Sequence, residues 1–244
     1  MLSQAVLILG GCGGIGRALA ALALQRDYVV DVIDLPQSIA ARRPEDVRHA
    51  IAADARDEAE LACAFNELAA KGATYAGFAN LCGFAAAQMP LAKTSSSTWD
   101  EVIDGNLRAA FLASQFAVPL IAAGGAMVHV GSGLGTSPRA GYGPYGVAKA
   151  GLVMLCRQLA LELAPALRVN CVAPGAIDTD FLRGGLGRDQ QEDSLDHTAY
   201  VSRIPLQRMA SPDDVARAIL FLLGEDAQFI TGQVLHVNGG LLMA

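Results

Sequence analysis

The chain has 244 residues, of which 52% are hydrophobic and 17% charged, a composition that fits one or two folded domains and argues against disorder. The formal net charge of −6, with no cluster of basic residues, argues against a nucleic-acid-binding surface. Five scattered cysteines without a Cys-x-x-Cys pair argue against a metal site and favour a reduced, cytoplasmic protein.

The first elements of the chain follow a pattern typical of dinucleotide binding. The apolar run Ala5–Leu9 predicts a buried strand, and it leads into the glycine loop Gly10–Gly16 and a helix over Arg17–Arg26. Glycines let a backbone approach a pyrophosphate, and a helix N-terminus offers it free N–H groups. Alone, the loop predicts only a tight turn, so its place between strand and helix is what favours a nucleotide site. The N-terminal sequence does not resemble a signal peptide, and no apolar run is long enough to suggest a membrane span.

A second strand, Tyr28–Ile33, ends at an acidic residue that bears on the choice of cofactor. Asp34 can accept a hydrogen bond from a ribose 2′-hydroxyl and would repel a 2′-phosphate. Leu35 and Pro36 follow it, so no adjacent basic side chain offsets the carboxylate. These residues favour NAD(H) over NADP(H).

In the glycine loop, Cys12 lies near a helix N-terminus, where the pKa of a thiol can fall, although we expect it to serve mainly as a small loop residue.

Strand and helix patterns continue to alternate along the chain. Further strands are predicted at Val47–Ala52, Tyr75–Leu81, Ala126–Gly131, Leu167–Val172 and Gln233–Val237. Further helices are predicted from an Asp57 cap to Gly72, from a capping box at Thr98 and Glu101 through Asn106 towards Gly124, from Tyr145 to Leu163, and from Ser211 and Pro212 to Gly224. This alternation predicts a doubly wound parallel α/β sheet. No shift in composition marks a boundary, so we expect a single domain over residues 1–244.

The stretch from Ser132 to Lys149 carries the residues with the strongest catalytic chemistry. Tyr145 and Lys149 are four apart, so on a helix they share a face. Lowering a tyrosine pKa from about 10 to about 7 takes roughly 4 kcal/mol, which one ammonium at about 4 Å supplies at an effective dielectric of 20. We therefore expect Lys149 to lower the pKa of Tyr145 and to make it a general acid/base. Alone, this spacing is more typical of an exposed helix face, and it is the surrounding motifs that favour the catalytic interpretation.

Four other features carry expectations of their own. Asp54 and Asn80 lie at strand ends, where cofactors lie in open parallel sheets, although caps and turns use the same residue types. Asn106 is an amide within a helix, either solvated or placed for function. His129 lies within a strand, and we expect a histidine that is packed in the core or that supports the site residues from behind. The polar, glycine-bearing segment at about residues 181–204 predicts a lid over the substrate.

In order along the chain, these motifs resemble those of the short-chain dehydrogenase/reductase family, over nearly the full length. Gly10-x-x-x-Gly14-Ile15-Gly16 resembles the nucleotide loop of the family, with Leu9 in place of its usual Thr. Asn80-Leu-Cys-Gly83 resembles its Asn-Asn-Ala-Gly segment, with departures at Leu81 and Cys82. Asn106, Ser132, Tyr145 and Lys149 match its catalytic tetrad, and Pro174-Gly175-x-Ile177-x-Thr179 resembles its segment for the nicotinamide carboxamide.

The resemblance implies a Rossmann fold of three layers, with a seven-stranded sheet in the order 3-2-1-4-5-6-7, and it implies a homotetramer. In this family, Tyr145 would transfer the proton, Lys149 would assist it and bind the nicotinamide ribose, Ser132 would orient the substrate oxygen, and Asn106 would hold a relay water. The cofactor-binding residues implied are Gly10, Gly14, Ile15, Gly16, Asp34, Leu35, Asp54, Ala55, Asn80, Gly83, Tyr145, Lys149, Pro174, Gly175, Ile177 and Thr179. The expected substrate walls are Ser132, Leu134, Tyr142, Ala176 and Phe181.

The leading hypothesis is an NAD-dependent oxidoreductase that transfers a hydride between nicotinamide C4 and a secondary alcohol or ketone. The alternative is a non-catalytic NAD-binding regulatory or scaffold protein of the same fold. The presence of all four tetrad residues favours the enzyme. The sequence leaves the substrate open: Arg139, Arg183 and Arg188 can meet an anionic group, or they can be solvated.

Overall fold

The computed structural model describes residues 4–186 and 195–243. Seven parallel strands form one sheet in the order β3-β2-β1-β4-β5-β6-β7, which confirms the predicted doubly wound order. The strands are β1 (Ala5–Leu9), β2 (Val29–Asp34), β3 (His49–Ala52), β4 (Tyr75–Asn80), β5 (Ile121–Val130), β6 (Arg168–Pro174) and β7 (Val234–Val237).

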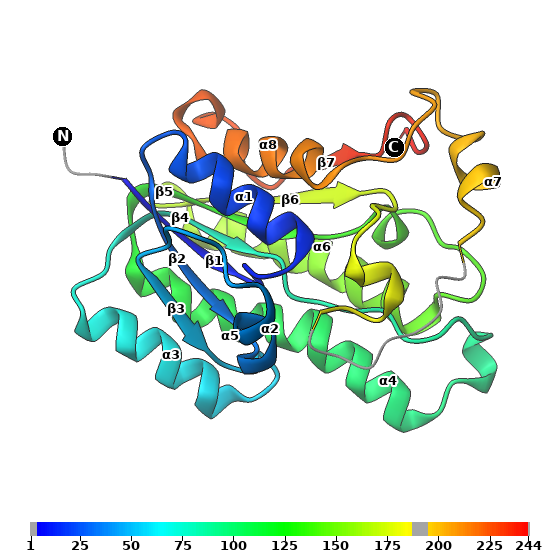
Figure 1. The fold of residues 1–244 in the computed structure, drawn as a ribbon, viewed down its shortest axis with the longest axis horizontal. Coiled ribbons are helices and arrows are strands. Elements are labelled where there is room, and N and C mark those ends of the chain that lie inside the picture. Colours follow the sequence, from blue (N-terminus) through cyan, green and yellow to red (C-terminus); the bar gives the residue numbers. More distant parts are fainter. Residues whose placement is uncertain (1–3, 187–194, 244) are drawn as a thin grey trace.

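Helices cover both faces of this sheet (Figure 1). The α-helices are α1 (Gly14–Leu24), α2 (Pro36–Arg42), α3 (Glu58–Ala70), α4 (Ser96–Ile103), α5 (Ala109–Ala117), α6 (Gly143–Leu163), α7 (His197–Val201) and α8 (Pro212–Leu223). Helices α1 and α8 pack on one face, and α3, α5 and α6 pack on the other. Successive side chains of a strand point to opposite faces, so Leu7 joins the core under α3 and α5 while Val6 and Ile8 join the core under α1 and α8.

The strand order places a crevice at one edge of the sheet. Strand β1 pairs with β2 on one side and with β4 on the other, so the chain reverses its direction of progress across the sheet between β3 and β4. In open α/β sheets, ligands bind outside the carboxyl ends of the strands at such a reversal. The loops that follow β1 to β6 therefore build the site.

The helix starts predicted at the caps Asp57 and Ser211 are confirmed. Helices α1 and α6 begin at Gly14 and Gly143, before the predicted Arg17 and Tyr145. The start predicted at Thr98 was wrong. Helix α4 begins at Ser96 with Ser95 as its N-cap, and the Ser95 hydroxyl accepts a hydrogen bond from the Thr98 N–H at 3.1 Å. Residues 95–98 are all Ser or Thr, so four adjacent residues were able to cap the helix and the pattern did not single out one of them.

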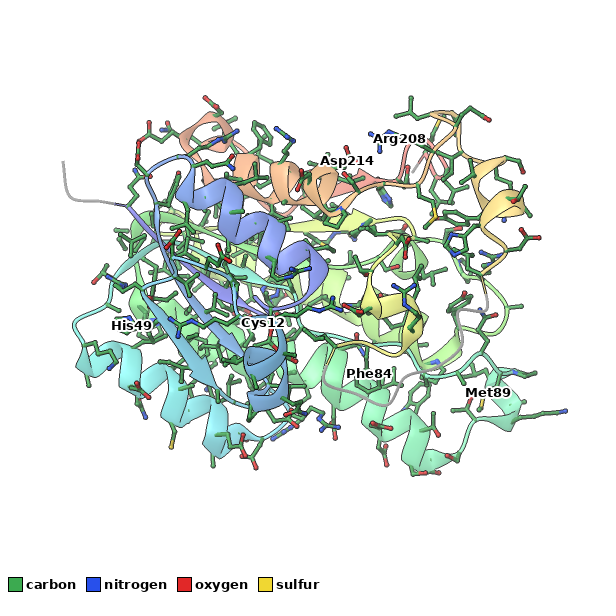
Figure 2. All side chains as sticks on the ribbon, in the orientation of Figure 1. Cys12, His49, Phe84, Met89, Arg208 and Asp214 are labelled. Carbon is green, nitrogen blue, oxygen red and sulfur yellow. The ribbon has the colours of Figure 1, made fainter. Side chains whose placement is uncertain are left out.

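At the start of α8, Ser211 is the N-cap and Asp214 completes a capping box. Figure 2 shows Arg208 beside Asp214, and their side chains form an ion pair at 2.6 Å. Asp57 caps α3, as predicted, through hydrogen bonds from Ala59 N–H and Glu60 N–H.

The long helix predicted through Asn106 is interrupted twice. A π-helical turn at Asp104–Arg108 separates α4 from α5, and a 3-10 turn at Val118–Leu120 ends the helical run at Pro119. Strand β5 then begins at Ile121, five residues before the predicted start. Helix α2 was not predicted.

Within the described residues, no helix is both long and apolar enough to cross a membrane.

Candidate active site

A cleft of about 790 Å³ lies at the carboxyl ends of the strands, a size suited to a small-molecule or cofactor site. Its lining includes every residue that the sequence proposed for catalysis, cofactor or substrate except Asn80 and Asn106, which lie behind its wall. The cofactor residues on the lining are Gly10, Gly14, Ile15, Gly16, Asp34, Leu35, Asp54, Ala55, Gly83, Tyr145, Lys149, Pro174, Gly175, Ile177 and Thr179. The substrate walls on the lining are Ser132, Leu134, Tyr142, Ala176 and Phe181.

The glycine loop between β1 and α1 fits a pyrophosphate. Gly10 has φ +83°, and a Cβ on Gly16 would lie 2.3 Å from the Gly10 carbonyl oxygen, so both positions require glycine. Gly13 is the N-cap of α1 and has no side chain to bind the first N–H groups of the helix. Gly13, Gly14 and Ile15 line the cleft, which leaves the positive end of the α1 dipole directed at an anion site.

Asp34, the last residue of β2, is held by the backbone on both carboxylate oxygens. Its Oδ2 accepts the Cys12 N–H at 2.7 Å and its Oδ1 accepts the Leu35 N–H at 2.8 Å. A carboxylate has about four acceptor positions, so lone pairs remain for a ribose hydroxyl. Burial raises the pKa of Asp34 despite these bonds.

Cys12, labelled in Figure 2, is buried, and its backbone N–H donates to the Asp34 carboxylate. Burial and the neighbouring carboxylate raise the pKa of the Cys12 thiol to about 12. The suggestion that the helix N-terminus lowers this pKa was wrong, because the side chain is fully buried and the nearest charge is negative. Cys12 is a small packed loop residue, which is the role that we mainly expected from the sequence.

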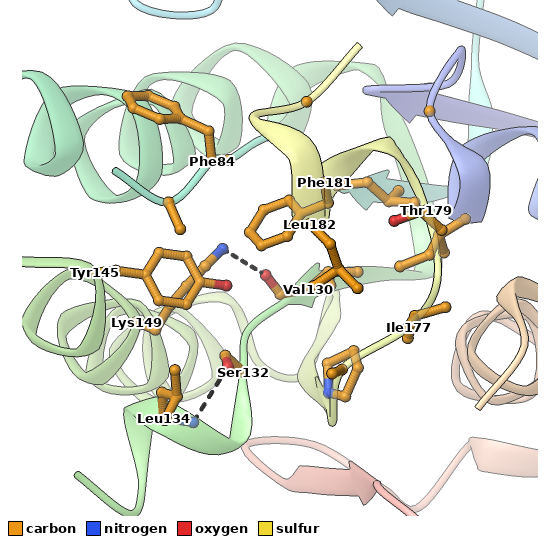
Figure 3. A pocket seen from close by; sticks show the side chains of 18 of the residues that line it. Phe84, Val130, Ser132, Leu134, Tyr145, Lys149, Ile177, Thr179, Phe181 and Leu182 are labelled. Atoms are coloured by element: carbon orange, nitrogen blue, oxygen red, sulfur yellow. Dashed lines mark hydrogen bonds between the residues drawn. The ribbon is translucent and has the colours of Figure 1, made fainter. Parts of the chain in front are cut away.

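Ser132, Tyr145 and Lys149 come together on one wall of the cleft (Figure 3). Ser132 follows β5, and its Oγ accepts the Leu134 N–H at 3.2 Å. Tyr145 and Lys149 lie one turn apart on α6, with Lys149 Nζ 5.6 Å from the centroid of the Tyr145 ring. Lys149 Nζ also donates to the Val130 carbonyl oxygen at 3.0 Å, which fixes the ammonium at the end of β5. The ring of Phe181 lies 5.9 Å from that of Tyr145, centroid to centroid.

Burial is the largest influence on the pKa values of Tyr145 and Lys149. It raises the pKa of Tyr145 above its ordinary value, although a hydrogen bond with Ser132 acts in the opposite direction. It lowers the pKa of Lys149 to about 8. The predicted lowering of the Tyr145 pKa by Lys149 is therefore not seen in this structure, because burial is the larger effect. Near neutral pH the phenol is protonated, which is the state that can donate a proton.

Asn106 lies in the π-helical turn, behind the cleft. Its Nδ2 donates to the carbonyl oxygens of Phe84 at 2.8 Å and Val102 at 2.9 Å. Its Oδ1 is buried and has no hydrogen-bond partner among the described residues. A Cβ on Gly83 would lie 2.4 Å from this oxygen and 3.1 Å from Lys149 Nζ, so the free acceptor and the ammonium flank the same stretch of backbone. An orphan buried acceptor of this kind fits a bound water.

Asn80 and His129 form a buried polar network at the ends of β4 and β5. Asn80 Oδ1 accepts the Cys82 N–H at 3.0 Å, and its Nδ2 lies 3.2 Å from His129 Nδ1. His129 Nε2 lies 3.3 Å from Ser114 Oγ. Burial lowers the pKa of His129 to about 3, so the ring is neutral. His129 is a core histidine, as predicted, and Asn80 holds the turn that carries Gly83.

Several residues of the cleft carried no sequence signal. Ser38 comes from α2, Tyr200 from α7, and Leu241 and Leu242 from the end of the chain. Each lies outside any recognised motif. The periodicity of a sequence reports which face of an element is buried, but it does not report which distant loop closes over a cleft. Of the predicted lid at 181–204, residues 187–194 lie outside the described residues.

A doubly wound sheet, a glycine cradle at a helix N-terminus and a Tyr–Lys pair in one cleft are the features of a dinucleotide-binding α/β enzyme. A family model described as enoyl-(acyl carrier protein) reductase matches residues 11–242. Carbonyl reductase family member 4 from Danio rerio is 35% identical over 246 residues, covering 98% of both chains. Cis-4-hydroxycyclohexanecarboxylate dehydrogenase from Sinomonas cyclohexanicum is 32% identical over 245 residues, covering 97% of this chain and 96% of that relative.

Among solved structures, a short-chain dehydrogenase/reductase from Brucella melitensis, described as a glucose/ribitol dehydrogenase, matches with a TM-score of 0.88 and 28% identity. The match covers 99% of this chain and 97% of that one. The chain therefore belongs to the short-chain dehydrogenase/reductase family. It is an oxidoreductase that acts on CH–OH or carbonyl groups.

Proposed function

We propose that the protein is an NAD-dependent dehydrogenase/reductase that interconverts a secondary alcohol and its ketone, with Tyr145 as general acid/base. The observation that carries the proposal is the placement of Ser132, Tyr145 and Lys149 on one wall of a cleft whose far end is the glycine loop. The small-molecule substrate lies in the cleft against this wall, next to Phe181. Two relatives, a carbonyl reductase and a hydroxycyclohexanecarboxylate dehydrogenase, support a substrate of this kind.

NAD(H) is the proposed cofactor because of Asp34. The carboxylate lines the cleft and is anchored by two backbone N–H groups, so it cannot swing away from a 2′-phosphate without breaking both bonds. Like charges placed against each other cost several kcal/mol. A 2′-hydroxyl instead donates to the remaining lone pairs of the carboxylate.

The residues of the site perform the proton chemistry in this proposal. A nicotinamide cofactor held by Lys149 and the Pro174–Thr179 segment would supply the hydride for the carbonyl carbon, or accept it from the alcohol carbon. Ser132 holds the substrate oxygen by a hydrogen bond, and Tyr145 gives its phenolic proton to that oxygen as the C–O bond becomes that of an alcohol. Lys149 stabilises the phenolate that results, since it lies against the same ring. The free Oδ1 of Asn106 holds a water that returns a proton through Lys149.

The test of the proposal is NADH oxidation and NAD reduction by the purified protein with a panel of ketones, secondary alcohols, cyclic diols and sugars. Tyr145→Phe removes only the proton-bearing oxygen and is expected to lower kcat by at least about a hundredfold, the lower end of what a positioned acid or base contributes. Turnover that survives in Tyr145→Phe contradicts the proton-transfer role. NADH binding without turnover of any panel member favours the non-catalytic alternative.

We further propose a cytoplasmic homotetramer. All five cysteines are free, which suits a reducing compartment. Several large apolar side chains are exposed on α5, α6 and the edge beyond α8, and the most exposed are Met154, Leu161 and Phe229. Apolar surfaces of this kind mark contacts between subunits.

We also propose one domain over residues 1–244, in which the flanks of the 181–204 segment act as a lid through Phe181 and Tyr200.

A further inference from the structure

Tyr200 makes a contact that the motifs of the chain do not account for. It lies on α7, and it and Ile204 are the buried residues of the described stretch 195–206. Its ring lines the cleft. The Tyr200 hydroxyl accepts the Ala176 N–H at 2.7 Å, and this hydrogen bond joins α7 to the segment Pro174–Thr179.

The Ala176 N–H, which donates to Tyr200, is the first backbone N–H after β6 that has no acceptor in the sheet. Strand β6 pairs with β7 as far as Pro174 and Val237, and the Gly175 N–H still donates to the Val237 carbonyl oxygen at 3.1 Å. At Ala176 the backbone departs from the ladder, so its N–H needs another acceptor. Tyr200 supplies that acceptor, and the next residue, Ile177, is held by a bridge to Ala210.

Gly175 has the residue type that this contact requires. A Cβ on Gly175 would lie 2.8 Å from the Tyr200 hydroxyl oxygen, which is closer than a carbon and an oxygen approach without a shift. The glycine therefore allows the phenol to reach the backbone of the next residue. Ile204, one turn beyond Tyr200, packs where a Cβ on Gly239 would be, so the segment after α7 is seated against the turn that follows β7.

We propose that Tyr200 is a positioning residue, whose hydrogen bond to Ala176 fixes the Pro174–Thr179 segment against the nicotinamide end of the cofactor. The inference rests on the proposed function, because that segment is assigned to the nicotinamide carboxamide. Tyr200 does not contact the reacting atoms in this assignment. Its loss is expected to weaken recognition of the nicotinamide half of the cofactor and to leave the adenosine half, bound at Asp34 and the glycine loop, unchanged.

The experiment measures the Kd of NADH and of ADP-ribose, which lacks the nicotinamide, for the wild type, Tyr200→Phe and Tyr28→Phe. Tyr28 is a half-buried tyrosine far from the cleft and serves as the matched control. For Tyr200→Phe we expect the Kd of NADH to rise about tenfold, equal to about 1.4 kcal/mol, within the cost of an unpaired buried N–H. The Kd of ADP-ribose is expected to stay constant. In turnover, KM for the cofactor should rise more than KM for the alcohol or ketone.

Two further measurements distinguish positioning from damage to the fold. The Ala176 amide should exchange its hydrogen faster in Tyr200→Phe than in the wild type. Gly175→Ala should raise the Kd of NADH as Tyr200→Phe does. Introduced into Tyr200→Phe, it should raise this Kd by a smaller factor than it does in the wild type, because both changes break the same contact. An unchanged Kd of NADH, an equal rise for NADH and ADP-ribose, or an Ala176 amide that stays protected overturns the inference. A wild type that binds no NADH overturns the proposed function as well.

Discussion

Asp34 is the residue on which the proposed preference for NAD(H) rests. Both of its oxygens are fixed by backbone N–H groups of Cys12 and Leu35, so its negative charge has a set position in the cleft. Arg17 and Arg43 lie close enough to oppose in part the rise that burial and Asp34 cause in the pKa of the adjacent Cys12. The charges around the expected ribose position are therefore mixed, and the anchored carboxylate is the group that opposes a phosphate there.

Replacing Asp34 with Asn removes the charge and keeps an oxygen for one backbone N–H. We expect the ratio of the NADP to the NAD dissociation constants to fall by at least about tenfold, since like-charge contact costs several kcal/mol and 1.4 kcal/mol is tenfold. Fluorescence titration with NADH and NADPH measures both constants. Asp54→Asn is the matched control, because Asp54 lines the same cleft but pairs with Arg56 at 2.6 Å. An unchanged ratio in Asp34→Asn would show that Asp34 does not set the preference.

At the scale of the elements, strands β2, β3 and β4 are joined by a buried charge away from the cleft. Asp31 on β2 is fully buried, and it accepts hydrogen bonds from Tyr75 Oη at 2.7 Å, Arg48 Nε at 3.1 Å and the His49 N–H at 3.0 Å. Burial alone would raise the pKa of Asp31, but the bonds from Arg48 and Tyr75 outweigh it and lower the pKa. The carboxylate therefore stabilises this side of the sheet when it is ionised.

Asp31→Ala is expected to lower the free energy of unfolding by about 3 kcal/mol, the cost of removing one partner of a buried pair. Because the folded pKa of Asp31 lies below its unfolded value of about 3.9, the contribution is complete above that value. It is lost as the pH falls through the folded pKa. Urea unfolding should thus give a constant difference between the two proteins from pH 5 to 8 and a smaller one below about pH 4.

The exposed pair of Lys71 and Glu67, 3.3 Å apart on α3, provides the control for Asp31. Lys71→Ala should cost at most about 0.5 kcal/mol. A loss in Asp31→Ala as small as that of the control, or a difference that grows on acidification, would contradict the role assigned to the buried carboxylate.

The elements predicted from the sequence were those with a strong local signal. All seven strands carried apolar runs, and Asp57 and Ser211 marked helix starts through their caps. Helix α2 was missed because its seven residues include one buried residue, Ser38, and so present no apolar stripe. The π-helical turn around Asn106 was missed because its register depends on tertiary contacts, such as Phe84 packing where a Cβ of Gly105 would be.

Across the whole molecule, the sequence predicted those site residues that have reactive side chains and also lie at a short, characteristic spacing in the chain. Ser132, Tyr145 and Lys149 are close in the chain and distinctive in type, so they were found. Tyr200 reaches the cleft from α7 and Leu242 from the turn after β7, and only the folded chain shows that Leu242 packs where a Cβ on Gly133 would be. The pKa of Tyr145 was also misjudged, because burial, which the sequence does not report, raises it.

The outer surface of α6 carries the remaining prediction. Val147, Met154 and Leu161 are seven residues apart, so they form a stripe along the helix, and they are 44%, 60% and 78% exposed. Phe111 on the neighbouring α5 is 50% exposed. An apolar stripe of this length in water favours burial against another copy of the chain.

Leu161→Glu places a charge in this stripe, and a buried charge without a partner costs several kcal/mol. We therefore expect the dissociation constant of the homotetramer to rise at least about a hundredfold, or about 2.8 kcal/mol, so that sedimentation velocity shows smaller species at micromolar protein. Ala69→Glu puts the same charge on the exposed face of α3 and should leave the sedimentation coefficient of the wild type unchanged. If Leu161→Glu sediments as the wild type does, the stripe is not a subunit interface. The β7 edge, where Phe229 and Leu235 are exposed, would then be the next surface to test for the proposed tetramer.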